Sequence, residues 1–169
     1  LKDGPNSVVV KVDNKRRRDG VPTLNTDWFN YGGLTRDVCI VEVPQTFISD
    51  YLIQLAKGRQ DLISGYVKLN GQKASQKIKI EIPELKIATE VTTDANGTAN
   101  IEITVKKLER WSTVNPKLYQ VNISAGGDAI SEKIGFRNIE TQGTDILLNG
   151  VSVFLRGICI HEENPMRGG

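Results

Sequence analysis

The sequence has few of the side chains from which most metal and catalytic sites are built. Its 169 residues include two cysteines, one histidine and one methionine, and only 6% are aromatic. A zinc site would have to combine His161 with the distant Cys39 and Cys159, and a Ser-His-Asp triad could use only His161. Cys39 lies in an apolar run, so we expect it to be a buried free thiol.

The sequence also lacks a charge excess and a long apolar run. Lys plus Arg total 22 and Asp plus Glu total 20, which argues against a nucleic-acid partner. No run approaches the roughly 20 apolar residues of a membrane helix, so no membrane partner is expected. The basic run Lys15–Arg18 is expected to be a solvated loop. The segment Leu1–Gly4 has no signal-peptide features, and the compartment, cytoplasmic or periplasmic, stays open.

Period-two alternation of β-branched residues recurs along the chain and predicts strands. Asn-Gly pairs at 70–71 and 149–150 and the segment Asp94–Gly97 predict turns between them. No ten-residue stretch carries a helical stripe. The predicted fold class is therefore all-β, an antiparallel immunoglobulin-like sandwich. The expected strands are 8–12, 38–43, 51–55, 63–69, 78–82, 85–91, 101–105, 119–123, 130–136, 146–148 and 151–155.

The two ends of the chain differ in pattern from its middle. Residues 49–137 hold about seven strand signals, which suits one complete sandwich. Residues 14–35 are poor in alternation, and the pattern changes again after Arg137. We interpret the chain as a fragment of a larger parent protein, with one whole domain at 49–137 and partial neighbouring domains at 1–48 and 138–169.

The segment Asp27–Val38 gathers three aromatic residues, two glycines and several charges. Aromatic faces stack on the C–H faces of a sugar, and a carboxylate or amide accepts its hydroxyls. The alternative is that the aromatic rings only pack the loop while charges brace it. We prefer the bracing role for Arg36 and Asp37. For Asp27, the residue chemistry leaves both interpretations open.

The segment Arg156–Pro165 is the second candidate for chemistry, because it delivers His161, Glu162 and Glu163 at the end of an apolar strand. A retaining glycosidase needs two carboxylates that face each other about 5–5.5 Å apart. Adjacent residues of an extended chain point to opposite sides, so Glu162 and Glu163 do not suit that role. A single histidine is more often structural than catalytic.

Taken together, these segments resemble glycoside hydrolase family 2, the family of β-galactosidases, β-glucuronidases and β-mannosidases. The order of the motifs resembles the end of that family's jelly-roll sugar-binding domain, its immunoglobulin-like domain and the first strand of its catalytic (β/α)8 barrel. The matching segments are Asn6–Asn14, Asp27–Val38, Asn115–Tyr119, Gly135–Arg137, Leu148–Gly157 and His161-Glu162.

The resemblance implies roles for residues that composition alone does not assign. Asp27 matches an acidic residue of the sugar subsite that helps bind a sodium ion in galactosidases, and His161 and Glu162 match residues at the terminal sugar. The catalytic glutamates of the family lie on later barrel strands, so we expect no catalytic residue and no cofactor in this chain. Cys159 and Ile160 depart from the common pattern, and they leave the substrate in doubt.

For the parent protein, the resemblance implies a retaining β-glycosidase with a carbohydrate substrate, most consistent with terminal β-galactosides. A β-glucuronidase of the same family is the near alternative. A sodium or magnesium ion and a homo-oligomeric state stay open for the parent. A free carbohydrate-binding or adhesion module is the alternative from another class, although such a module has no need for a segment that resembles the barrel entry.

Overall fold

The computed structural model of the chain describes residues 3–21, 24, 32–34 and 36–159. The chain divides into two units, Glu42–Arg156 and a second unit formed by Leu1–Val41 and Gly157–Gly169. Every helix and strand of the described residues lies within Glu42–Arg156. In that part of the chain, no helix has the length and hydrophobicity needed to span a membrane.

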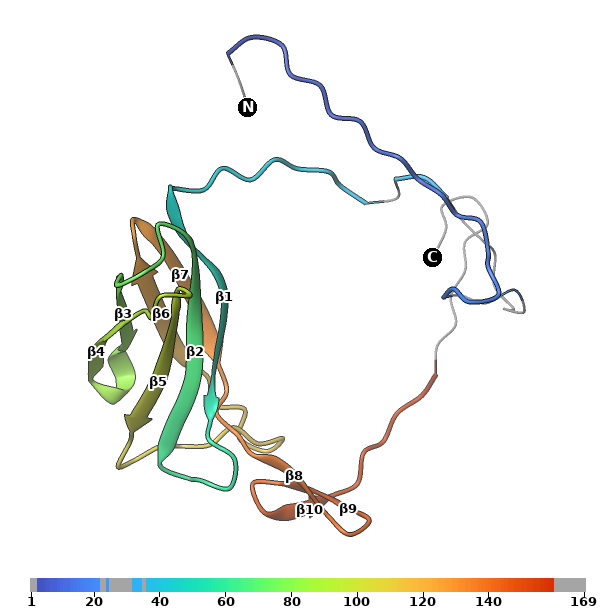
Figure 1. The fold of residues 1–169 in the computed structure, drawn as a ribbon. Helices are drawn as coiled ribbons and strands as arrows, with labels where there is room; N and C mark the ends of the chain where they lie inside the picture. Colours follow the sequence, from blue (N-terminus) through green and yellow to red (C-terminus); the bar gives the residue numbers. More distant parts are fainter. Residues whose placement is uncertain (1–2, 22–23, 25–31, 35, 160–169) are drawn as a thin grey trace. The chain divides into compact units, whose positions relative to one another are not determined.

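Seven strands form two antiparallel sheets that pack face to face (Figure 1). One sheet has the order β1-β2-β5 and the other has the order β4-β3-β6-β7. The fourth strand therefore joins the second sheet, whereas in constant-type immunoglobulin domains it joins the first. The predicted all-β, immunoglobulin-like antiparallel sandwich is confirmed. The strands are β1 Thr46–Leu55, β2 Leu62–Gly71, β3 Lys77–Ile82, β4 Ile87–Thr92, β5 Thr98–Thr104, β6 Tyr119–Ala125 and β7 Asp128–Ile134.

The core follows directly from the alternation in the sequence. In β3, Ile78, Ile80 and Ile82 are all 0% exposed, while Lys79 between them is exposed and Glu81 is half-buried. Burying one such side chain contributes about 1.5–3 kcal/mol. Apolar residues of both sheets and of the adjoining loops complete this one core: Ile48, Ile53, Leu55, Ile63, Val67, Leu69, Ala99, Ile101, Val105, Tyr119, Val121, Ile123, Ala125 and Phe136.

A β-bulge divides β1 into two halves of opposite parity. Ile48 pairs with Leu69, but the next pair is Asp50 with Lys68, so Ser49 is an extra residue. Buried positions are therefore even-numbered before the bulge and odd-numbered after it, as at Ile53 and Leu55. The predicted strand at 51–55 covers only the second half, because the bulge interrupts the alternation on which the prediction depends.

The edge strands β1 and β7 run parallel to each other where the two sheets meet. Two carboxylates of β7 connect them, because the Ile48 N–H donates to Asp128 Oδ2 at 2.9 Å and the Tyr51 hydroxyl donates to Glu132. We call this contact the β1/β7 seam. Side chains, and not a ladder of backbone hydrogen bonds, make these two links.

The predicted strand 85–91 begins later than expected. Pro83–Leu85 form a short 3-10 helix, and Lys86 takes a left-handed conformation with φ 54° before β4 starts. Proline fixes its own φ and suits the first position of a helical turn, which explains the start of this turn. Leu85 still packs against the core, so its apolar character was informative about burial although not about strand structure.

A tyrosine at the start of β6 ties a long loop to the sandwich. The Tyr119 hydroxyl accepts a hydrogen bond from the Glu109 N–H at 3.0 Å, and its ring lies 5.8 Å from that of Phe136. A buried tyrosine whose hydroxyl reaches back to upstream backbone at this corner is typical of immunoglobulin-like sandwiches. The loop 105–118 is therefore held in place without secondary structure of its own.

A small antiparallel sheet follows the sandwich, formed by β8 Ile139–Gln142, β9 Asp145–Leu148 and β10 Val151–Val153. The predicted hairpin at Asn149-Gly150 is confirmed, and both residues have positive φ, 55° and 84°. The strand predicted at 151–155 ends at Val153, and Phe154 and Leu155 are 85% and 71% exposed.

Three predictions in the first 45 residues are wrong. Residues 8–12 and 38–43 form no strand, and Cys39 is exposed, not buried. Apolar alternation suits a residue for a sheet, but a strand exists only where a neighbouring strand accepts its backbone hydrogen bonds. None of the described strands pairs with either segment, and their valines stay exposed.

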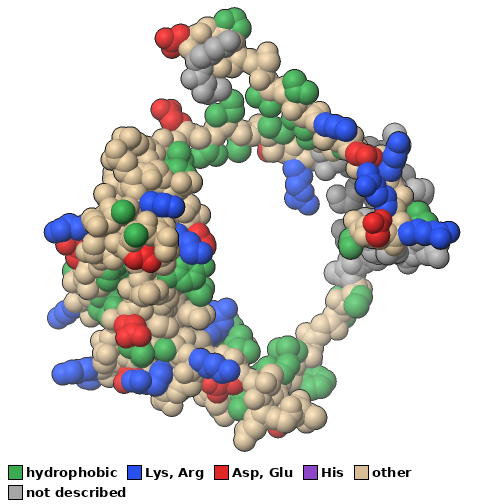
Figure 2. Space-filling model, viewed as in Figure 1, with side chains coloured by type: hydrophobic (Ala, Val, Ile, Leu, Met, Phe, Trp, Pro, Cys, Tyr) green, Lys and Arg blue, Asp and Glu red, His purple; other side chains and the backbone are tan. Residues whose placement is uncertain are grey.

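Charged side chains of both signs are interspersed over the sandwich (Figure 2). Several form exposed pairs, such as Lys77 of β3 with Glu90 of β4 and Lys79 with Glu81 within β3, each at 2.8 Å. Such exposed pairs contribute little to stability. They give the sheets a solvated outer face.

Candidate functional site

The three residues predicted to bind the sugar, Asp27, His161 and Glu162, lie outside the described residues. Their roles, and the ion proposed for Asp27, stay predictions. The structure does describe residues close to them in the sequence. Gly32–Leu34 follow Asp27, and Ile158 and Cys159 precede His161. Both Ile158 and Cys159 are exposed.

A hollow of about 350 Å³ lies beside the first of these segments, within the unit that contains residues 1–41. Its described lining includes Gly32, Gly33 and the basic residues Lys15, Arg16 and Arg17. Gly32 permits a close approach, because a Cβ there would lie 2.7 Å from the Asn14 side-chain nitrogen.

One carboxylate moderates the charge of this basic segment. Asp13 accepts a hydrogen bond from the Lys15 N–H at 3.1 Å and lies 3.7 Å from the Arg17 guanidinium. Both partners of the ion pair are largely exposed, so its contribution to stability is small. Among the described lining residues of this hollow, Asp13 is the one acidic residue.

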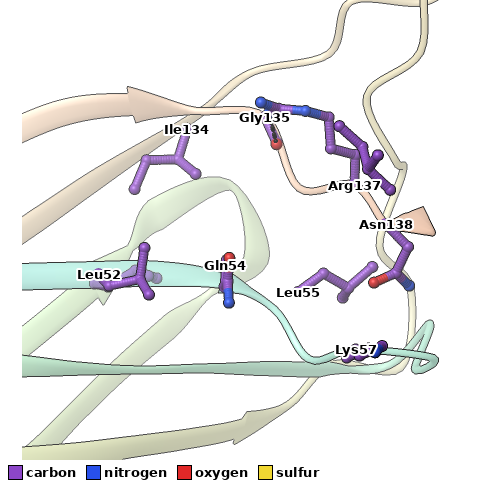
Figure 3. Close-up of a pocket in the computed structure, with 10 residues that line it drawn as sticks. Leu52, Gln54, Leu55, Lys57, Ile134, Gly135, Arg137 and Asn138 are labelled. Carbon is purple, nitrogen blue, oxygen red and sulfur yellow. Dashed lines mark hydrogen bonds between the residues drawn. The ribbon is translucent and has the colours of Figure 1, made fainter. Parts of the chain in front are cut away.

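A second hollow, of about 440 Å³, lies at the end of the sandwich where β1 and β7 finish. Figure 3 shows Leu52 and Gln54 on β1, with Ile134 and Gly135 at the end of β7. Leu52, Ile134 and Ile139 supply apolar surface, and Lys57 and Arg137 supply positive charge. No acidic residue is among its described lining residues, so this hollow holds no general acid, general base or carboxylate nucleophile of its own.

Two asparagines beside this second hollow join the sandwich to the small sheet. Asn138 is 8% exposed and its Nδ2 donates to the Arg59 carbonyl at 2.6 Å. The Asn149 amide makes two bonds, donating to the Trp111 carbonyl at 2.9 Å and accepting from the Asn138 N–H at 3.1 Å. The Asn149 N–H also donates to the Asn138 carbonyl. We call the four residues that these bonds join, Arg59, Trp111, Asn138 and Asn149, the asparagine clamp.

The clamp rests on the sandwich through Trp111. The Trp111 N–H donates to the Phe136 carbonyl, and the Arg137 guanidinium lies 5.2 Å from the centre of the indole ring. A Cβ at Gly135 would lie 2.8 Å from that ring, so a glycine is needed for this approach. The clamp therefore fixes the start of β8 and the β9–β10 turn on residues that belong to the sandwich.

Sequence reasoning found the Asn149-Gly150 turn but missed the clamp. Asn138 and Arg59 are 79 positions apart, and Asn149 and Trp111 are 38 apart, so no local pattern links them. The available signal was weak: an asparagine directly after the sandwich, and a tryptophan in a loop with few apolar residues.

The described residues also show where pKa values shift. Hydrogen bonding to Glu132 raises the pKa of Tyr51, and hydrogen bonding to Asp50 raises that of Tyr66. Hydrogen bonds to Glu90 and Glu84 raise the pKa values of Lys77 and Lys117. These pairs lie on the outer surface of the sandwich and not in either hollow, so they belong to its surface chemistry. Among the described residues, no cluster of three or more histidine, cysteine or acidic side chains could hold a metal ion.

The topology and the clamp define an immunoglobulin-like sandwich with a small sheet attached at one end. The family model described as "Glycosyl hydrolases family 2" matches residues 46–137, which is more than half of the chain. The chain therefore belongs to the glycosyl hydrolases of family 2, and the predicted membership is confirmed.

Curated relatives align along almost the whole chain. A putative β-glucuronidase of Formosa agariphila is 28% identical over 97% of this chain, which covers 22% of that protein. A β-galactosidase of Staphylococcus xylosus is 26% identical over 99% of this chain, which covers 17% of that protein. The chain thus spans about a fifth of the length of these relatives.

Solved structures of the family are also similar to this chain. A β-galacturonidase from Eisenbergiella tayi bound to galacturonate has a TM-score of 0.68 and 25% identity, and the match covers 93% of this chain and 30% of that one. A β-glucuronidase from Ruminococcus gnavus in complex with D-glucaro-d-lactam has a TM-score of 0.65 and 27% identity, with 92% and 30% covered. The relatives therefore include enzymes named for different sugars.

Proposed function

We propose that this chain is part of a retaining β-glycosidase that hydrolyses terminal β-galactosides. The observation that carries the proposal is the family match over 46–137, together with relatives named β-galactosidase that align along nearly all of the chain. Retaining hydrolysis requires an acid/base carboxyl and a nucleophilic carboxylate on either side of the glycosidic bond. We assign both to parts of the parent protein beyond these 169 residues.

In this proposal the sandwich acts as a rigid support. The asparagine clamp fixes the small sheet on the sandwich, and residues 154–159 lead from that sheet toward His161 and Glu162. Substrate-contacting groups must be held within a fraction of an ångström to be effective, so a fixed support favours their correct placement. Asp27, His161 and Glu162 would contact the terminal sugar, with a sodium ion at Asp27.

A β-glucuronide is the second candidate substrate. It is favoured by the Formosa agariphila relative and by the Ruminococcus gnavus structure, both named for glucuronides. The two sugars differ at C6, which carries a hydroxyl in galactose and a carboxylate in glucuronic acid.

The substrate is tested with the full-length protein that contains this chain. We expect aryl β-galactosides to be cleaved with a higher kcat/KM than aryl β-glucuronides. The reverse order would replace the first candidate with the second. Absence of cleavage of either substrate, with retained binding of a sugar, would instead favour a carbohydrate-binding module.

The site residues are tested by Asp27→Ala and His161→Ala in the same full-length protein. Loss of a charge-assisted bond to a sugar hydroxyl costs about 1.5–3 kcal/mol, or roughly ten- to hundredfold in kcat/KM. The matched control is Asp37→Ala, the same change ten positions further along. A loss of kcat/KM at unchanged melting temperature supports the subsite, whereas a lower melting temperature with intact kcat/KM would show that the residues only stabilise the fold.

A further inference from the structure

The chain contains the dipeptide Asn-Gly three times, at 70–71, 96–97 and 149–150. In this dipeptide the glycine nitrogen can attack the asparagine side-chain amide, because glycine offers little steric hindrance. The dipeptide is the same at all three sites, so a difference in their reactivity must come from the folded structure. Their surroundings differ in the two features that matter for the attack: where the asparagine amide points, and what holds the glycine N–H.

At Asn70, the two reacting groups already face each other. The Gly71 N–H donates to the Asn70 side-chain oxygen at 2.8 Å. The amide carbon is one C=O bond, about 1.23 Å, from that oxygen, so it lies close to the same nitrogen. Both residues are exposed at the end of β2, where water can reach them. The nitrogen and the amide carbon that must bond therefore lie within about 4 Å of each other in the folded chain.

At Asn96, the nucleophile is engaged elsewhere. The Gly97 N–H donates to the Asp94 carbonyl at 3.1 Å within the turn that joins β4 and β5. Gly97 is also buried, whereas Gly71 is exposed. Attack at Asn96 therefore requires the turn to open first.

At Asn149, the electrophile is held away from the glycine. Both ends of its amide take part in the asparagine clamp, with Nδ2 bound to the Trp111 carbonyl and Oδ1 bound to the Asn138 N–H. Rotation of this amide toward the Gly150 nitrogen would break both bonds. The folded structure thus protects Asn149.

We propose that Asn70-Gly71 is a site of spontaneous modification by cyclisation and deamidation. The Gly71 nitrogen forms a bond to the Asn70 side-chain carbon, the carbon–nitrogen bond of the amide breaks, and ammonia leaves with the proton from the Gly71 nitrogen. Water then opens the resulting succinimide. Opening at one carbonyl gives aspartate and opening at the other gives isoaspartate, so the net reaction exchanges NH2 for OH and no oxidant is needed.

The two products have different structural consequences. Aspartate keeps an acceptor in reach of the Gly71 N–H and adds one negative charge. Isoaspartate adds a methylene group to the backbone, at the point where Asn70 pairs with Phe47 and Gly71 pairs with Thr46. The extra length shifts the register of the residue pairs that join the start of β1 to the end of β2. Isoaspartate therefore loosens the entry of the chain into the sandwich.

The test follows all three sites in one sample. The full-length protein is incubated in its folded state at mildly alkaline pH, and its peptides are mapped by mass spectrometry over time. Peptides with isoaspartate are distinguished from those with aspartate by their chromatographic retention times. We expect Asn70 to react first, at least about tenfold faster than Asn149, with Asn96 between them. A parallel incubation in denaturant removes the folded geometry and should bring the three rates together.

Asn70→Gln is the matched variant, because its longer side chain cyclises much more slowly while keeping the amide. It should abolish the modification at residue 70 and leave the rates at Asn96 and Asn149 unchanged. The proposal is wrong if the folded protein modifies Asn96 or Asn149 before Asn70. It is equally wrong if Asn70 reacts more slowly in the folded protein than in denaturant.

Discussion

Two apolar stretches of this chain alternate in the same way and meet opposite fates. In β3, Ile78, Ile80 and Ile82 are 0% exposed, whereas Val8, Val10 and Val12, outside the sandwich, are 71%, 50% and 48% exposed. The isoleucines lie between two paired strands, β4 and β6, and face a second sheet. Residues 8–12 pair with no described strand. Alternation thus measures how well a segment suits a sheet, and only a partner strand turns that suitability into burial.

The largest difference between the two regions should appear on truncating one isoleucine in each. Ile80 is 0% exposed and Ile40 is 73% exposed. We expect Ile80→Ala to lower the free energy of unfolding by about 2–5 kcal/mol, because it leaves a cavity in the core. Ile40→Ala should change it by less than about 0.5 kcal/mol. Chemical denaturation of both variants measures this, and equal losses would contradict the contrast.

The next largest difference between the two regions is expected where two backbone segments lie in close contact. A Cβ at Gly65 would lie 1.7 Å from the Leu52 carbonyl oxygen, while a Cβ at Gly157 would meet no non-neighbouring atom within 4 Å. We expect Gly65→Ala to lower the free energy of unfolding by about 1–3 kcal/mol or more, because β1 and β2 must separate locally. Gly157→Ala should leave the unfolding midpoint unchanged. If both variants unfold at the same denaturant concentration, the close approach of β1 and β2 is not what requires the glycine.

The asparagine clamp should show a smaller effect that is confined to one region. Asn149→Ala removes two hydrogen bonds, each contributing about 0.5–1.5 kcal/mol. We expect faster amide exchange in β8, β9 and β10, with little change in β3 and β6. Asn100→Ala, on the exposed face of β5, is the matched control and should alter neither. Uniformly faster exchange over the whole sandwich would show that the clamp supports the core and not the attachment of the small sheet.

The smallest effect concerns pH. Hydrogen bonding to Glu132 raises the pKa of Tyr51 in the folded chain, so the unfolded chain loses its phenol proton first, at about pH 10. The stabilisation is present below that pH and is lost as pH rises through the raised pKa of the folded state. Unfolding free energies measured from roughly pH 8 to 11 should fall, and less steeply in Tyr51→Phe. An unchanged slope in that variant would assign the fall to Tyr66 and the paired lysines.

The strands of the sandwich could be predicted from the sequence because their pattern is local. Ile78, Ile80 and Ile82, and likewise Val121 and Ile123, are two residues apart and face the same core. Predictions failed where a non-local or irregular feature decided the outcome. The bulge at Ser49 hid the start of β1, and the left-handed Lys86 delayed β4. The exposure of Cys39 depends on the absence of a described partner strand, which no single segment reveals.

The candidate site was predicted from the sequence in a different way. Asp27, His161 and Glu162 came from resemblance to a family, and they lie outside the described residues, so they remain predictions. The asparagine clamp came from the structure alone, because folding brings together Arg59, Trp111, Asn138 and Asn149. Residues that join two elements are chosen by tertiary geometry, and their spacing along the chain carries no signature.

The β1/β7 seam has a consequence for how the sandwich resists mechanical force. Its first and last strands run parallel, so tension applied to the two ends of the sandwich pulls those strands in opposite directions along their length. Such a load acts in shear on both links of the seam, the one between Ile48 and Asp128 and the one between Tyr51 and Glu132. Two bonds loaded together resist more than bonds opened one after another, so the sandwich can transmit tension along the chain while its core stays closed.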